Sequence, residues 1–202
     1  MSGDGYHHGD LRRTVMAAAV AAIAESGPAG WSLRELARRA GVSHAAPAHH
    51  FGDKTGLLTA VAAEGYALFA DALEAAGDDL HAVGLAYVRF AVEHRAHFEV
   101  MFSPGLYRAG DPEVTAARDR AGRVLAASVR DTAQGGEQGG EQDGAQGAAP
   151  GDGDGDDRTR GIAAWSIVHG FAHLWLSGAL PPELGDDPVA AAAPVIAHLF
   201  RP

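Results

Sequence analysis

The stretch Trp31-Ser-Leu-Arg-Glu-Leu-Ala-Arg-Arg-Ala-Gly-Val-Ser-His-Ala-Ala-Pro-Ala-His-His-Phe-Gly-Asp-Lys-Thr-Gly-Leu-Leu58 is the most informative part of the chain. It predicts two short helices that meet at a glycine turn, with a third helix directly after them. Ser32 and Glu35 have the spacing of a capping box, in which the serine accepts from the glutamate amide and the glutamate reaches back. Gly41 supplies the left-handed residue of the turn, and Ser43 is the expected cap of the second helix. The pattern is typical of a helix-turn-helix, whose second helix enters the DNA major groove.

The composition predicts an all-α protein. The chain has 202 residues and is 47% hydrophobic, and much of that content is alanine, which favours helix over strand. Val, Ile and Thr are too thinly spread to form alternating strand runs. There is no cysteine, so disulfides and thiolate metal sites are excluded. No apolar run is long enough to span a membrane and the N-terminus does not resemble a signal peptide, so we expect a cytoplasmic protein without a membrane partner.

The distribution of charge removes an apparent objection to DNA binding. The net charge is −10, which by itself counts against a nucleic-acid partner. However, residues 1–70 carry six basic and six acidic side chains, whereas residues 135–157 carry seven acidic and no basic ones. The acidity is therefore concentrated far from the helix-turn-helix, and the objection is weak.

Helical periodicity and stop signals divide the rest of the chain. Residues 135–157 hold nine glycines and no aromatic or branched apolar side chain, so we expect a disordered loop there. A break is expected near Arg95, within the apolar segment 80–102. Asp111-Pro112 marks a helix start. The expected helices are 10–26, 33–40, a short one after Ser43, 54–76, 80–102 with its break, 112–132, 158–180 and 188–200.

The residues after the turn identify a family. Leu36-Ala37, Ala40-Gly41-Val42-Ser43, His50-Phe51, Lys54 and Leu57 have the order and spacing found in the DNA-binding domain of TetR/AcrR transcriptional regulators. Residues 9–70 therefore resemble that domain, with its motif at residues 32–51. Further along, Trp165-Ser-Ile-Val-His-Gly170 resembles the Trp-His-Gly signature of a subgroup's C-terminal domain.

The resemblance implies an architecture and a function. It implies an all-α homodimer with a helix-turn-helix head at 9–70 and a helical ligand-binding and dimerisation core at 78–202, where helix 158–180 and the final helix build the interface. The implied partners are double-stranded DNA with a pseudo-palindromic operator, a second copy of the chain, and a small-molecule effector that the sequence does not name. The expected activity is transcriptional regulation, as a repressor released by the effector, with no enzymatic activity, cofactor or metal.

The recognition helix departs from the family pattern. Pro47 lacks the amide of a normal helix start, so we expect a distorted or shortened start. Ala48 stands where the family has a tyrosine that contacts a phosphate, and Ala46 also lacks a hydroxyl. Contacts are therefore expected from helix caps, histidines and neighbouring basic residues. The predicted DNA-binding residues are Ser32, Arg34, Ser43, His44, Ala45, His49, His50 and Lys54.

The C-terminal region offers candidates for an effector site. Five side chains between residues 87 and 101 recur at helical spacing and form a stripe, which is interpreted either as plain core or as pocket lining. The Trp-His-Gly segment adds two more residues. The ligand-binding candidates are Tyr87, Phe90, His94, Phe98, Met101, Trp165 and His169. His169 and His173 share a helix face, yet no third metal ligand is identifiable. Two alternatives stay open: a small helical metal-binding sensor or enzyme using the histidines, and a dimeric DNA-binding protein that needs no ligand.

Overall fold

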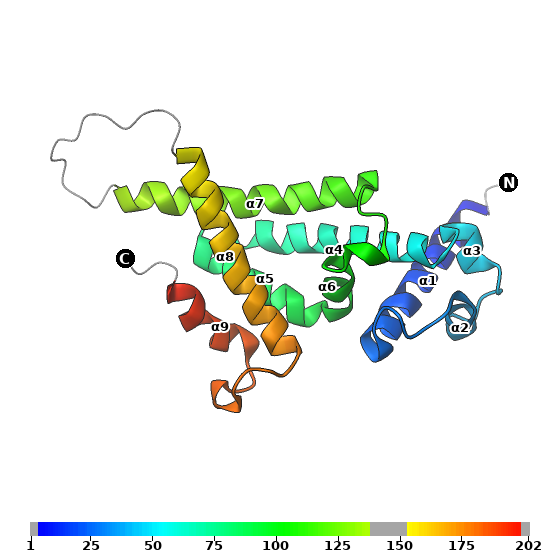
Figure 1. The fold of residues 1–202 in the computed structure, drawn as a ribbon. Helices are drawn as coiled ribbons and strands as arrows, with labels where there is room; N and C mark the ends of the chain where they lie inside the picture. The colour runs from blue at the N-terminus through cyan, green and yellow to red at the C-terminus, as the bar shows by residue number, and fades with distance from the viewer. Residues whose placement is uncertain (1–3, 138–152, 199–202) are drawn as a thin grey trace. The chain divides into compact units, whose positions relative to one another are not determined.

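The computed structural model describes residues 4–137 and 153–198 (Figure 1). Within these ranges the protein is helical and has no strand, as the composition predicts. The elements are α1 (Asp4–Ser26), α2 (Leu33–Arg39), α3 (Ala46–Phe51), α4 (Lys54–Ala75), α5 (Leu80–Glu93), α6 (Arg95–Met101), η1 (Pro104–Leu106), α7 (Pro112–Glu137), α8 (Gly153–Leu176), η2 (Pro182–Leu184) and α9 (Pro188–Ala197).

Two compact units divide the chain. One comprises Met1–Leu68 and His94–Arg118, and the other comprises Phe69–Glu93 and Asp119–Pro202. The predicted division into 9–70 and 78–202 leaves residues 94–118 with the C-terminal part, whereas contacts place them with the N-terminal one. The reason is that α6 packs against α1, a long-range contact that helical periodicity does not reveal.

The first unit has a core built from α1, α2, α4 and α6. Val15, Ile23, Leu36 and Leu57 are almost completely buried in it. The hydroxyl of Tyr66 donates to the carbonyl oxygen of Met101 at 3.1 Å. The hydroxyl of Tyr107 donates to the same oxygen at 2.9 Å. Burial raises the pKa of Tyr66, so the phenol stays protonated and keeps this donor role.

The second unit packs α5 against α8 and α9, which lie beside one another in Figure 1. Phe69, Tyr87 and Phe90 form an aromatic group with ring centroids about 5 Å apart. Gly84 of α5 permits the close approach of α9, because a Cβ added there lies 3.1 Å from Ile196 Cγ2 and 3.4 Å from Val168 Cγ1. A bulky residue at Gly84 leaves no room for this packing.

The predicted helix boundaries are confirmed for α4, and the predicted break at Arg95 separates α5 from α6. The expected disordered loop at 135–157 is too wide. Its ends, 135–137 and 153–157, are helical and extend α7 and α8, because glycine weakens a helix without preventing its extension by a turn. The remainder of that loop, 138–152, lies outside the described residues.

Among the described residues, α4 is the one helix long and apolar enough to span a membrane by length and composition. Most of its apolar window is buried within the protein. Leu57, Val61 and Leu73, for example, have no exposed surface. The apolar character of α4 is therefore that of a core helix.

The packing at Gly84 yields a first prediction. Gly84→Leu should lower the free energy of unfolding by about 1–3 kcal/mol, because the new side chain overlaps Ile196 and Val168. The matched control is Gly122→Leu on α7, where an added Cβ meets no atom within 4 Å and leucine raises helix propensity by up to about 1 kcal/mol. Urea unfolding of the three proteins measures both effects. Equal stabilities for the two variants would contradict the packing argument.

Candidate nucleic-acid interface and apolar cavity

The N-terminus of α2 is formed by the predicted serine cap. Ser32 Oγ accepts from the Glu35 amide at 3.3 Å, which confirms half of the capping box. The other half is wrong, because the Glu35 carboxylate bonds Arg38 and Arg39 instead. These two arginines hold the pKa of Glu35 down at about 2. Arg39 also pairs with Glu25 of α1, so this ion-pair group ties α2 to α1.

The turn and α3 combine a confirmed prediction with a correction. Gly41 has φ +66°, as the glycine turn requires. Ser43 does not cap α3: the helix starts at Ala46, its N-cap is Ala45, and no side chain caps it. Pro47 therefore lies in the first turn, where a missing amide removes no intrahelical bond. The predicted shortening of the helix start is the result.

The faces of α3 separate core from solvent. Ala46 and Pro47 are buried, and the ring of Phe51 lies under the Arg12 guanidinium at 5.5 Å, so α3 is held against α1. The predicted DNA-binding side chains lie on the other side or at helix starts. Ser32, Arg34, Ser43, His44, Ala45 and His49 are exposed, and His50 and Lys54 are partly exposed.

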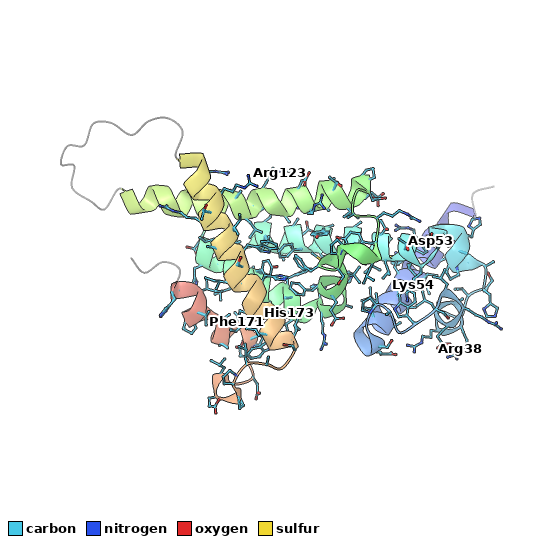
Figure 2. The ribbon with its side chains drawn as sticks, in the orientation of Figure 1. Arg38, Asp53, Lys54, Arg123, Phe171 and His173 are labelled. Atoms are coloured by element: carbon cyan, nitrogen blue, oxygen red, sulfur yellow. The ribbon has the colours of Figure 1, made fainter. Side chains whose placement is uncertain are left out.

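Lys54 has a structural role that the sequence does not indicate. Its Nζ donates to the carbonyl oxygens of Ala29 at 3.1 Å and Trp31 at 2.8 Å. It also lies 4.2 Å from the centroid of the Trp31 ring, a favourable cation–π arrangement. Partial burial lowers its pKa. The first residue of α4 thus holds the chain that leads into α2 (Figure 2).

Asp53 and Arg108 are two interface-supporting residues that sequence reasoning misses. Asp53 Oδ1 accepts from the Gly56 amide at 2.6 Å and so caps α4. Arg108 Nη2 donates to both Asp53 carboxylate oxygens at 3.0–3.1 Å, and the Arg108 amide donates to Thr59 Oγ1. An Asp immediately before a helix start is a sequence signal for a cap. Its pairing with Arg108, 55 positions away, has no such signal.

The second unit contains an apolar cavity of about 220 Å³. Its walls come from α5, α7, α8 and α9 and consist of Gly, Ala, Val, Leu and Ile with one tryptophan, Trp165. Among the predicted ligand-binding residues, Trp165 lines this cavity. Phe90 is buried against Phe69. His94, Phe98 and Met101 belong to the first unit.

Tyr87 and His169 form a chain of hydrogen bonds with Trp165. The Trp165 Nε1–H donates to the Tyr87 hydroxyl oxygen at 3.3 Å, and the Tyr87 hydroxyl shares a 2.9 Å hydrogen bond with His169 Nδ1. Burial, with the neighbouring His173, lowers the pKa of His169. A neutral imidazole carries a single N–H, and its tautomer decides whether Nδ1 accepts from or donates to the Tyr87 hydroxyl. These bonds fix the indole as a cavity wall.

Within residues 4–137 and 153–198, no three His, Asp or Glu side chains are grouped as a metal site requires. The His169 and His173 rings are stacked with centroids 6.4 Å apart. His49 and His50 are edge-on at 5.3 Å. Both pairs are ring contacts between helical neighbours.

Two family models match the chain, one for each part of this arrangement. Residues 15–61 match the bacterial regulatory proteins of the tetR family, and residues 80–199 match the tetracyclin repressor-like C-terminal domain. The chain belongs to the TetR family. It is accordingly a DNA-binding transcriptional regulator with a helix-turn-helix head. No curated protein matches the chain.

Solved structures with the same fold span nearly the whole chain. A protein of unknown function from Rhodococcus sp. RHA1 is 30% identical, with a TM-score of 0.72 over 98% of this chain and 97% of its own. The TetR family regulator PfmR from Thermus thermophilus is 22% identical, with a TM-score of 0.65 over 92% and 96%. AibR, in complex with isovaleryl coenzyme A and operator DNA, is 17% identical, with a TM-score of 0.65 over 94% and 98%.

The contacts of Lys54 yield a second prediction. Lys54→Met should weaken DNA binding and also lower the free energy of unfolding by about 1–3 kcal/mol, because the carbonyls of Ala29 and Trp31 lose a charged donor. Gel-shift titration and urea unfolding measure the two effects.

The control for this experiment is Arg34→Gln. Arg34 is exposed on α2, so its loss should weaken DNA binding and reduce the salt slope by about one without a change in stability. A Lys54→Met protein as stable as the wild type would show that its two hydrogen bonds do not support the head.

Proposed function

We propose that this protein is a cytoplasmic, homodimeric repressor that binds a pseudo-palindromic operator and leaves it when a small molecule binds the second unit. The observation that carries the proposal is the exposed face formed by Ser32, Arg34, Ser43, His44, Ala45 and His49, presented by two capped or packed short helices. The match of residues 15–61 to the tetR-family regulatory proteins supports DNA as the partner of this face. We further propose that the chain has no enzymatic activity.

The division of roles across the face follows from residue chemistry. The N-terminus of α2, with Ser32 and Arg34, presents a hydroxyl, free amides and a guanidinium, which suit phosphate oxygens. His44 and His49 are the polar side chains placed for base edges, and the Ala45 methyl suits a thymine methyl. His50 and Lys54 complete the proposed contact set at its border.

Response to a ligand is supported by the cavity and by a relative. AibR binds isovaleryl coenzyme A and operator DNA, and the second unit of this chain offers an apolar cavity lined by Trp165. A ligand that binds better to the form that does not fit the operator shifts the population away from DNA. The alternative of ligand-independent binding predicts that no metabolite releases the operator.

Homodimer formation is supported by an apolar face on α8. Ile162, Trp165 and Leu174 are 52%, 43% and 45% exposed. Ile162, Ser166, Gly170 and Leu174 recur at every fourth position and so follow one side of the helix, with Trp165 at its edge. An added Cβ at Gly170 meets no atom within 4 Å. An exposed apolar stripe with small residues between large ones suits a second helix, and a two-fold axis brings the same stripe from another copy.

The operator prediction is tested by selection from random DNA. The full-length protein should enrich a sequence with two inverted half-sites whose centres lie about one helical turn or a multiple of it apart. His44→Ala with His49→Ala should lose affinity for that sequence more than for random DNA. Arg130→Gln, exposed on α7, is the control that should bind as the wild type does. Failure to enrich any sequence would contradict the proposal.

Effector release is then tested on the selected operator. Metabolite fractions that include acyl-coenzyme A esters should release it from the wild-type protein in a gel shift. Metal analysis of the purified protein addresses the alternative of a histidine metal sensor. A stoichiometric bound metal with no DNA binding would favour that alternative.

The dimer prediction concerns Leu174. Leu174→Glu should convert the dimer to a monomer in light scattering and weaken operator binding by at least about tenfold, because a buried unpaired charge costs several kcal/mol. Ala116→Glu, exposed on α7, is the charge-matched control and should remain dimeric. A dimeric Leu174→Glu protein would place the interface elsewhere.

A further inference from the structure

The cavity of the second unit has an unusual lining of glycines. Gly84, Gly122 and Gly161 lie in its wall, one on each of α5, α7 and α8. Gly84 is needed for the packing of α5 on α9. A Cβ added at Gly122 or Gly161 meets no atom within 4 Å. Helical glycine costs about 1 kcal/mol relative to alanine, and at these two positions no packing against the described residues explains that cost. Their effect is to leave space.

The chemistry of the wall excludes a polar occupant. Among the residues that the structure describes, no charged side chain lines the cavity, and the indole N–H of Trp165 is the one side-chain polar group in its wall. That N–H already donates to the Tyr87 hydroxyl, which in turn bonds His169. A polar group against these walls would find no free side-chain partner among the described residues, so it belongs at the solvent-exposed side, where Ile162 and Trp165 are 52% and 43% exposed. The occupant, or the part of it that enters, is therefore apolar.

The volume sets the size. An apolar cavity of about 150 Å³ in a protein core holds one benzene molecule. The 220 Å³ here is larger than that but below the roughly 300–1,000 Å³ of typical drug-sized ligand sites. By proportion it holds about six to ten carbon atoms, and the rest of a longer chain would lie outside these walls.

We propose that this cavity binds a short apolar chain or ring of about six to ten carbons, with any polar end outside, and that Trp165 is the wall against which it packs. This proposal rests on the proposed function, because it takes the molecule in the cavity to be the effector that releases the operator. α7 is one continuous helix that belongs to both units. An occupant that moves its cavity-lining part therefore has a covalent route to the unit that carries the DNA-binding face.

The probes for the test are straight-chain alcohols from butanol to dodecanol, added to the full-length protein. Binding is followed by tryptophan fluorescence and by the thermal unfolding midpoint, which rises when a ligand binds the folded state. Affinity should rise with chain length up to about octanol or decanol and then stop rising, because the additional carbons lie outside the cavity and bury no further apolar surface. Trp165→Phe should remove most of the fluorescence change, with Trp31 and Trp175 as the unaffected background.

The decisive variant is Gly161→Leu, which fills the cavity from its own wall. It should fold, bind the selected operator as the wild type does, and lose octanol binding by at least about tenfold. Gly155→Leu is the matched control: it makes the same change on the same helix at an exposed glycine outside the cavity lining. It should bind octanol normally. This contrast separates filling of the cavity from any general effect of leucine on α8.

Three results would overturn the inference. The first is that Gly161→Leu binds octanol as tightly as the wild type does. The second is that affinity keeps rising up to dodecanol. The third is that only the monomeric Leu174→Glu protein binds the alcohols, which would assign the cavity to the partner copy. Operator release by metabolites is measured separately on the same variants. If Gly161→Leu is still released, the proposed function stands and its effector binds elsewhere; if no protein is released, the proposed function itself fails.

Discussion

A six-residue helix cannot maintain itself in water, and the DNA-binding face of this protein depends on one. Helix formation has a costly nucleus, so α2 and α3, with seven and six residues, exist because other groups hold them. Burial of Ala46 and Pro47 fixes one side of α3. Contacts at the start of α4 and along α1 supply the rest. Among these, Lys54 holds the entry to α2, and Asp53 caps α4 while it bonds Arg108.

This dependence explains why Lys54 and Asp53 are adjacent. Asp53 fixes where α4 begins, and Lys54 is then the first helical residue, aimed back at the carbonyls of Ala29 and Trp31. The Lys54 ammonium thus has polar partners at the surface, and the apolar ring of Trp31 lies beneath it. Loss of Asp53 removes the cap of α4, and loss of Lys54 removes two hydrogen bonds from the chain that enters α2. A lysine here is therefore more than a phosphate contact.

The sequence predicts what local chemistry determines. The Ser32 cap, the Gly41 turn, the extent of α4 and the Arg95 break depend on neighbours in the chain, and all are present. Prediction fails where distant contacts decide. The pattern places the cap of α3 at Ser43, but the helix starts at Ala46, on the buried side that packs against the rest of the unit. Likewise, the stripe from Tyr87 to Met101 is continuous in sequence, yet its parts belong to different units.

The surfaces proposed for binding are of different kinds in the two units, polar in the first and apolar in the second. In the first, polar contacts hold the short helices: Arg39 pairs with Glu25 and so ties α2 to α1 at the exposed surface. In the described part of the second, apolar groups remain without partners of their own: an open cavity wall and an exposed stripe on α8. Apolar surface that the chain does not cover itself is costly in water. Ile162 and Trp165 belong to both surfaces, so the proposed small apolar molecule and the proposed second copy of the chain meet at these two side chains.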